Sequence, residues 1–377
     1  MTSSVSWVRN RYPPMYRSPQ LFSLSSSSSP TQAYPLLRTR DTMAALSQLA
    51  SIESSVKPSI KVTRRTDRST YMFLLQHLLK PFNAYLVKPK QVYPAGSPRL
   101  DPHKKAKKRC DVMERCVDDI YLYDLEPKRP AAGGREEKKR RKRLYYFAGG
   151  GWQMPASSEH WALCAEMANK LPDIAITVVS YPLAPNSAAP VAILMLLKLY
   201  NTLLRDAEDA GEEVILAGDS AGGNIALCLP LAALSEDPDG PCPTAIMTIS
   251  ASTDLRRHNP DIKVVEKHDP ILRIPFINGT AKAWRGEWSP VDPRVSPLYA
   301  DVSVLARRGI KVHGVAGRYD ILGPDAVLFR EKCNQAWVQG EWLDWEKQMH
   351  VFPLTWAYKL PEGVQSKDWI LDVLRRS

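Results

Sequence analysis

Short runs of apolar, often β-branched residues recur from about residue 117 onward, and polar or glycine-containing segments separate them. Runs of this kind predict buried strands. We predict strands at 117–125, 144–147, 214–216, 311–316 and 342–345. An apolar, helix-compatible stretch at 224–234 follows the third run, so a strand is expected to turn sharply into a helix near residue 220.

The turn between that strand and helix has the sequence Gly-Asp-Ser-Ala-Gly at 218–222, which fits the G-x-S-x-G pattern of a nucleophile elbow. Small residues flank Ser220 where strand and helix converge. The helix directs its N-terminal amides at an oxyanion formed on the serine's substrate. The pattern alone occurs often by chance, but its strand–turn–helix context makes Ser220 the candidate nucleophile.

A serine nucleophile needs a histidine to accept its proton and a carboxylate to orient that histidine. In an α/β hydrolase these partners follow the serine in the order acid, then histidine, each after a later strand. Asp320 lies just beyond the run 311–316, and His350 lies just beyond 342–345. His350 is the only histidine after Asp320, so the chain order selects this pair.

The other polar candidates after Ser220 have structural interpretations. His313 lies within a predicted strand, where a hydrogen-bonded structural histidine is expected. His258 and His268 lie in a polar stretch that predicts surface or pocket-wall positions. Asp325 is the alternative acid, but its Gly-Pro-Asp-Ala context favours a helix N-cap.

Three consecutive glycines at 149–151 follow the predicted strand 144–147. Glycines let a backbone approach a substrate closely and present its N–H groups, as an oxyanion hole requires. An ordinary flexible loop is the alternative interpretation. The position after a strand and upstream of Ser220 favours the oxyanion loop.

Seven sequence blocks in this order resemble the hormone-sensitive-lipase branch of the α/β hydrolases: 145–152, 181–185, 218–224, 250–255, 296–301, 317–322 and 349–352. The resemblance implies an α/β fold, with a mostly parallel central sheet, helices on both faces and an N-terminal helical cap. It implies a carboxylic-ester hydrolase, an esterase or lipase. The implied triad is Ser220, Asp320 and His350, and the implied oxyanion-hole amides are those of Gly149, Gly150 and Ala221.

The chain departs from the family pattern in three places. Ala148 stands where the family usually has a histidine that helps to hold the glycine loop. Ser180 and Asn186 replace acidic structural partners. Pro230 removes a backbone donor from the predicted helix and is expected to kink it. None of these changes removes a catalytic group.

The net charge of +11 is unevenly distributed. Residues 1–143 contain 29 basic and 12 acidic residues, whereas the rest of the chain contains 22 and 28. Two basic clusters, 103–109 and 138–143, contribute much of the excess, and the second is expected to form a hairpin arm. Neither has interleaved aromatic residues or a nucleic-acid-binding fold beside it, so no nucleic acid is expected as a partner. Weak peripheral contact with an anionic membrane is an alternative to a solvated face.

Three parts are expected along the chain: a disordered or targeting leader at 1–45, a helical cap and linker at 46–110, and a catalytic domain at 111–377. Part of 256–290 is expected to complete the cap. The leader is rich in Arg and Ser and poor in acidic residues, as mitochondrial transit peptides are, but its prolines disfavour an amphipathic helix. An intracellular, cytoplasmic location is therefore the main expectation, and a mitochondrial location is the alternative. Residues 71–86 predict an apolar helix too short to span a bilayer.

The six cysteines show neither a C-x-x-C pair nor zinc-site spacing, and the chain has no phosphate-binding glycine motif and no H-E-x-x-H. No cofactor and no metal are therefore expected. The expected partner is a small-molecule ester substrate, and no oligomeric state follows from the sequence. A catalytically silent binding module on the same fold is the alternative function, and Ala148 is the feature that favours it.

Overall fold

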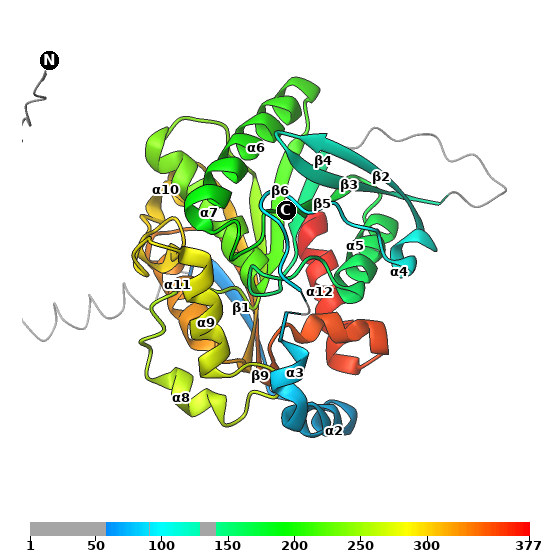
Figure 1. Cartoon of the computed structure of the whole chain (residues 1–377), viewed down its shortest axis with the longest axis vertical. Coiled ribbons are helices and arrows are strands. Elements are labelled where there is room, and N and C mark those ends of the chain that lie inside the picture. Colours follow the sequence, from blue (N-terminus) through cyan, green and yellow to red (C-terminus); the bar gives the residue numbers. More distant parts are fainter. Residues whose placement is uncertain (1–57, 90, 129–140) are drawn as a thin grey trace, which may run out of the picture. The chain divides into compact units, whose positions relative to one another are not determined.

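The computed structural model describes residues 58–89, 91–128 and 141–377. The expected leader at 1–45 lies outside this part of the chain, as do residues 138–140 of the second basic cluster. In Figure 1 the described elements are coloured along the sequence from blue to red.

Nine strands in the described part of the chain form one sheet, in the order β1-β9-β8-β7-β6-β4-β5-β3-β2. The pairs from β1 to β5 in this order are parallel, whereas β3 pairs in the antiparallel sense with both β5 and β2. The mostly parallel sheet is as predicted. The strands are β1 (Ile60–Arg65), β2 (Cys110–Val117), β3 (Ile120–Pro127), β4 (Lys142–Phe147), β5 (Ile174–Ser180), β6 (Glu213–Asp219), β7 (Ala245–Ile249), β8 (Lys311–Tyr319) and β9 (Gly340–Met349).

Helices cover both faces of this sheet, and the strands alternate their side chains between the two layers. In β4, Tyr145 and Phe147 pack into one layer, and Leu144 and Tyr146 pack into the other. The first layer includes α6 (Ala189–Ala210), α7 (Ser220–Glu236), α10 (Ser303–Arg307) and α11 (Gly323–Gln335). The second includes α5 (Ser158–Lys170) and α12 (Pro361–Arg376). In Figure 1 the sheet lies between them.

The remaining helical elements follow β1, β7 or β9 in the sequence. They are α2 (Thr70–Leu79), α3 (Asn83–Leu86), α4 (Lys104–Lys107), α8 (Asp261–Glu266), α9 (Ile274–Arg285) and the 3₁₀ turns η1 (Lys80–Phe82), η2 (Pro297–Tyr299) and η3 (Phe352–Tyr358). Val87, α8 and α9 share an apolar cluster with Ile321 and Leu322, which directly follow Asp320. The segments expected to form the cap therefore contact one another beside the acid loop.

Two expectations about the N-terminal half are wrong. Residues 46–110 are not only cap and linker, because Ile60–Arg65 forms the edge strand β1 and pairs in parallel with β9. The second basic cluster is not a hairpin arm, because β5 lies between β3 and β4 in the sheet. Strands β3 and β4 are therefore not neighbours in the sheet, and Lys142 and Arg143 already belong to β4.

Candidate active site

Ser220 lies at the junction of β6 and α7 with φ = 51°, a left-handed conformation that non-glycine residues rarely adopt. The close approach of neighbouring backbone explains the small residues around it. A Cβ on Gly222 would overlap the carbonyl oxygen of Phe147, and one on Gly218 would overlap the backbone of Gly222. The sharp turn therefore presents Ser220 at the carboxyl end of the sheet, as a nucleophile elbow does.

Ser220, His350 and Asp320 form a continuous hydrogen-bonded chain. His350 Nε2 lies 2.9 Å from Ser220 Oγ, and His350 Nδ1 lies 2.9 Å from Asp320 Oδ2. A carboxylate accepts hydrogen bonds, so the proton lies on Nδ1 and leaves Nε2 free to accept from the serine hydroxyl. The chain order of the sequence thus selects three residues that the fold brings together.

The two partners of Ser220 come from adjacent strands. Asp320 follows β8 and is fully buried, and its Oδ1 accepts a hydrogen bond from the amide of Leu322. His350 follows β9, and the amide of the next residue, Val351, donates to Ser250 Oγ at 3.1 Å. Each of these two loops is therefore fixed by its own backbone contacts as well as by the chain of side chains.

Burial and nearby charge shift the pKa of His350 in opposite directions. Burial disfavours the imidazolium, but the adjacent Asp320 carboxylate, together with the charges of Asp269 and Asp219, outweighs it and raises the pKa of His350 above its ordinary value. Asp269 lies nearby with its carboxylate accepting amides of Leu272 at 2.9 Å and Ile321 at 2.9 Å. Burial, assisted by the negative charge of Asp320, raises the pKa of Asp269. Asp269 thus links the cap segment to the acid loop.

The alternative acid, Asp325, has a different environment. It is buried in the first turn of α11, and its Oδ1 accepts a hydrogen bond from Asn259 Nδ2 at 2.9 Å. Burial raises its pKa to about 6. The predicted N-cap role is wrong, because Leu322 occupies that position and the Asp325 side chain bonds another side chain instead of a helix amide. Asp325 makes no hydrogen bond to His350.

The remaining histidines have the structural roles expected. His313 is buried, accepts a hydrogen bond from the amide of Glu341 at 3.0 Å, and has its pKa lowered to about 4 by burial. His258 and His268 are exposed, and His268 stacks on Tyr319 with ring centroids 4.7 Å apart. None of the three takes part in the chain that ends at Ser220.

The glycine loop after β4 is anchored by a carboxylate that the sequence interpretation overlooked. Asp219 Oδ1 accepts hydrogen bonds from the amide of Gly149 at 2.9 Å and from the Tyr146 hydroxyl at 2.8 Å. His160 Nε2 lies 3.1 Å from Asp219 Oδ2. Burial opposes ionisation of Asp219, but His160 and these two donors outweigh it and lower its pKa.

His160 also caps the N-terminus of α5. Its Nδ1 accepts the amide of Ser157 at 2.9 Å in the capping box of α5, so its proton lies on Nε2 and points at Asp219. Tyr181 also holds the loop, because its hydroxyl donates to the carbonyl of Ala148 at 2.8 Å. The loop is therefore supported without a histidine at position 148.

This anchoring corrects one expected oxyanion donor. The N–H of Gly149 already donates to Asp219, so it is not available to a substrate oxyanion. The amides of Gly150 and Gly151 donate to no protein acceptor among the described residues. Ala221 is the second residue of α7, where amides have no partner within the helix. The available donors are thus Gly150, Gly151 and Ala221.

Helix α9 lies against the glycine loop. The Trp284 ring stacks on Trp152, with centroids 5.7 Å apart and planes 7° apart. A Cβ on Gly151 would lie 2.9 Å from Thr280 and 3.4 Å from Phe276. The loop that offers free amides is therefore covered by the segment that the sequence assigns to the cap.

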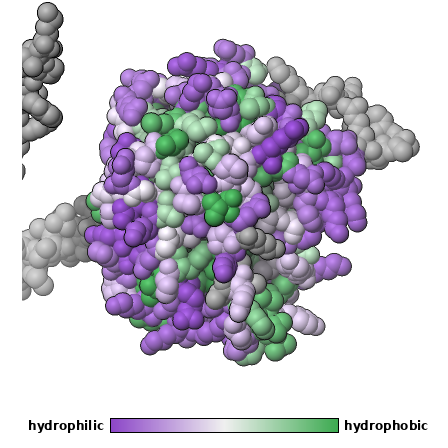
Figure 2. Space-filling model, in the orientation of Figure 1, coloured by the Kyte–Doolittle hydropathy of each residue, from purple (hydrophilic) through white to green (hydrophobic). Residues whose placement is uncertain are grey.

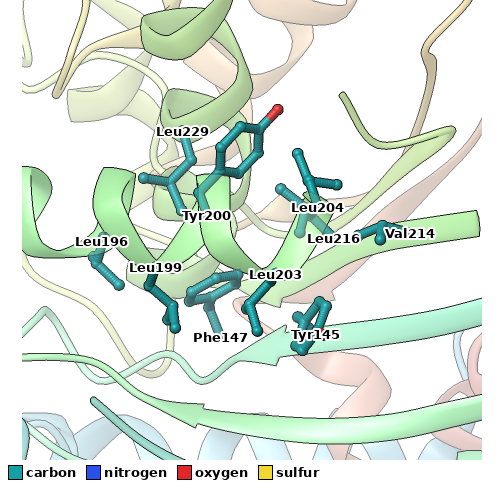
Figure 3. A pocket seen from close by; sticks show the side chains of 10 residues that line it. All are labelled: Tyr145, Phe147, Leu196, Leu199, Tyr200, Leu203, Leu204, Val214, Leu216 and Leu229. Carbon is teal, nitrogen blue, oxygen red and sulfur yellow. The ribbon is translucent and has the colours of Figure 1, made fainter. Parts of the chain in front are cut away.

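Figure 3 shows an apolar cavity of about 10 Å³ between α6 and strands β4 and β6. Tyr145, Phe147, Leu199 and Val214 are among its lining residues, and none belongs to the triad. A space of this size holds at most one water molecule, and its apolar lining does not favour one. We interpret it as a packing defect in the core and not as a substrate pocket.

The residues overlooked in the sequence share one property. Asp219, His160 and Asp269 act through contacts between segments 50 or more residues apart. Only Asp219 carried a signal, because it lies within the elbow motif itself. In the described part of the chain, no group of three His, Cys, Asp or Glu residues could hold a metal ion, and no helix is long and apolar enough to cross a membrane.

Relatives of this chain carry esterase names. An esterase from Acinetobacter venetianus is 33% identical over 178 residues, which cover 47% of this chain and 56% of that protein. Esterase LipU from Mycobacterium tuberculosis is 28% identical over 220 residues, which cover 56% of this chain and 70% of that protein. The chain thus spans little more than half the length of the first relative.

Solved structures share the fold. An esterase from the bacterial hormone-sensitive lipase family has a TM-score of 0.65 at 20% identity, covering 82% of this chain and 99% of its own. An esterase/lipase from an uncultured bacterium has a TM-score of 0.63 at 22% identity, with the same coverage. A family profile described as the alpha/beta hydrolase fold matches residues 144–354, more than half of this chain. The chain therefore belongs to the α/β hydrolase fold family, as its resemblance to the hormone-sensitive-lipase branch predicts.

Proposed function

We propose that this protein is a serine carboxylic-ester hydrolase. The observation that carries the proposal is the chain from Ser220 Oγ through His350 to Asp320, with both distances at 2.9 Å and the serine on a strained elbow. This geometry lets His350 accept the serine proton as Oγ attacks an ester carbonyl. Asp320 holds the required tautomer and stabilises the imidazolium.

The oxyanion of the tetrahedral intermediate is received by backbone amides. We assign this role to Gly150, Gly151 and Ala221, whose N–H groups are free of protein acceptors. In comparable sites, loss of one such donor raises the activation free energy by about 3 kcal/mol. The leaving alcohol takes the proton from His350, and water then repeats the sequence on the acyl-enzyme. No cofactor enters any of these steps.

A catalytically silent binding module is the alternative, and Ala148 was its main support. That support weakens because Asp219 and Tyr181 hold the loop through Gly149 and Ala148. The substrate class that fits this site is a small-molecule carboxylic ester.

A fluorophosphonate probe tests the proposal directly. The wild-type chain should be labelled at Ser220 and should hydrolyse p-nitrophenyl esters, whereas Ser220→Ala should lose both properties. Ser235→Ala is the matched control, because Ser235 lies on the same helix and bonds only the carbonyl of Ala232. Labelling and turnover that survive in Ser220→Ala would refute the proposal and leave the binding module as the better interpretation.

A further inference from the structure

Five large apolar side chains are exposed on the successive elements α2, η1 and α3. Their exposed fractions are 73%, 57%, 65%, 54% and 80% for Tyr71, Leu74, Leu78, Phe82 and Tyr85. Spacings of three and four residues place Tyr71, Leu74 and Leu78 along one side of α2, and Phe82 and Tyr85 follow on η1 and α3. We call these five residues the exposed stripe. Figure 2 shows a hydrophobic patch where Figure 1 places α2.

The opposite side of α2 packs on the rest of the protein. Met72 is buried in the core, and Gln76 Nε2 donates to the carbonyl of Lys347 at 2.8 Å. Packing of α2 on the protein therefore does not require the exposed stripe. Large apolar side chains that line up in solvent mark an interaction surface.

The charge around the exposed stripe favours one kind of partner. No Asp or Glu occurs between Asp67 and Asp101, while this interval contains five basic residues. Lys80 and Lys88, within and just beyond the stripe, are exposed. Apolar and aromatic side chains beside basic residues are typical of helices that lie in the interface of an anionic membrane. Two copies joined through this face would instead bring the same basic residues together.

The exposed stripe is also connected to the catalytic loops. Gln76 bonds Lys347, three residues before His350, and Lys80 Nζ donates to the carbonyl of Lys267, two residues before Asp269. Val87 packs against Ile321 and Leu322 beside Asp320. A surface bound to the exposed stripe thus lies on the side of the molecule that carries the acid and histidine loops.

We propose that the exposed stripe docks this protein on anionic lipid surfaces, so that its substrates include water-insoluble esters dissolved in lipid. The statement about substrates rests on the proposed function, whereas the docking does not. Tyr71, Leu74, Leu78, Phe82 and Tyr85 insert at the level of the headgroups, and the neighbouring lysines contact anionic lipid.

Vesicle co-sedimentation tests the docking in the full chain carrying Ser220→Ala, so that no lipid is hydrolysed. The vesicles contain phosphatidylcholine and phosphatidylserine at a ratio of 3 to 1. Leu74→Ser with Leu78→Ser should lower the partition coefficient by roughly tenfold. The matched control is Val191→Ser with Leu194→Ser, which removes two side chains 55% and 61% exposed on α6 and should bind as the parent does.

Three results would overturn the proposal. The stripe variant could bind as the control does, or the parent could bind pure phosphatidylcholine vesicles equally well. The parent could also be a dimer in light scattering that the stripe variant converts to monomer, which would identify a second copy as the occupant. Equal thermal midpoints of both variants check that neither substitution has altered folding.

A second arm uses chains with Ser220 intact and separates docking from catalysis. The stripe variant should hydrolyse soluble p-nitrophenyl acetate as the parent does, but should hydrolyse a long-chain ester held in the anionic vesicles roughly tenfold more slowly. Equal rates on the vesicle ester would overturn the substrate statement. If the parent binds vesicles but hydrolyses neither ester, the proposed function fails and the docking stands.

Discussion

Asp320 and Asp325 lie five residues apart and are both fully buried, yet their side chains have different partners. Asp320 bonds His350, while Asp325 bonds Asn259. Sequence context alone favoured Asp320 through its position after a strand. The structure adds the physical reason, because only the Asp320 carboxylate reaches an imidazole nitrogen.

Asparagine substitutions distinguish the two residues. Asp320→Asn should leave the fold intact but favour the wrong tautomer of His350, and kcat should fall by a factor of order 10⁴, as in serine proteases with this change. Asp325→Asn should lower kcat by less than about tenfold, because an asparagine oxygen can still accept from Asn259. Steady-state kinetics on one short-chain ester gives both values. Comparable losses would mean that the acid is wrongly assigned.

The raised pKa of His350 fixes the direction of the pH dependence. In the proposed mechanism neutral His350 is the base, so kcat/KM should rise with pH through the raised pKa and level off above it. The midpoint should lie above the ordinary histidine value of about 6.5, and in Asp320→Asn it should move down because the main raising charge is gone. A rate profile measured from roughly pH 5 to pH 9 shows this. A profile without any limb in that range would argue against histidine as the base.

At the scale of elements, the strands around the site could be predicted because each is a short apolar run followed by its functional residue. The edge strand β1 could not. It is paired on one side only, and Lys61 and Arg64 are exposed, so its sequence does not look like a buried strand. The expected hairpin failed for a related reason, since a sequence does not show that β5 inserts between β3 and β4.

The expected kink at Pro230 also belongs to this scale. Helix α7 runs from Ser220 to Glu236 as one element with Pro230 inside it. Departures at Ser180 and Asn186 are accommodated locally: Ser180 Oγ donates to the carbonyl of Pro98, and Asn186 Nδ2 donates to that of Tyr93. These residues hold the linker before β2 without the acidic groups that the family usually places there.

The glycine loop offers a comparison between two substitutions. Gly150 has φ = 133°, and a Cβ there would lie 2.6 Å from the carbonyl oxygen of Met154. Gly150→Val should therefore displace the free amides and lower kcat/KM by at least about 10²-fold, the effect of losing one oxyanion donor. Ala148→Ser leaves every amide in place and should cost far less. Both values come from hydrolysis of one short-chain ester, and a larger loss in Ala148→Ser would exclude this loop as the oxyanion hole.

At the scale of the whole molecule, the compact unit that contains the site begins at Pro58. The first strand of this unit and the residues beside it make several contacts with the C-terminal half of the chain. Ile60 is buried in the core, Ser59 Oγ donates to the carbonyl of Asn334, and Trp345 Nε1 donates to the carbonyl of Asp67. The stability of the β9 edge should therefore depend on this segment.

Two truncations test that dependence. A chain that starts at residue 58 should keep the thermal midpoint and the kcat/KM of the full chain on a soluble ester. A chain that starts at residue 67 lacks β1 and exposes the backbone of β9, so its midpoint should fall by at least about 5 °C in calorimetry. An unchanged midpoint in the shorter chain would show that β1 adds nothing to the stability of the sheet.

Asp219 has a consequence for how such an enzyme can diversify. It adjoins Ser220 in the chain and accepts a hydrogen bond from Gly149, so in the proposed mechanism one residue positions both the attacking oxygen and the loop that binds the oxyanion. Changes in the cap that suit substrates of different size can therefore leave the distance between the Ser220 hydroxyl and the glycine loop unchanged. Reactivity is thereby separated from selectivity: the cap sequence is free to drift toward new esters while the reaction centre keeps its dimensions.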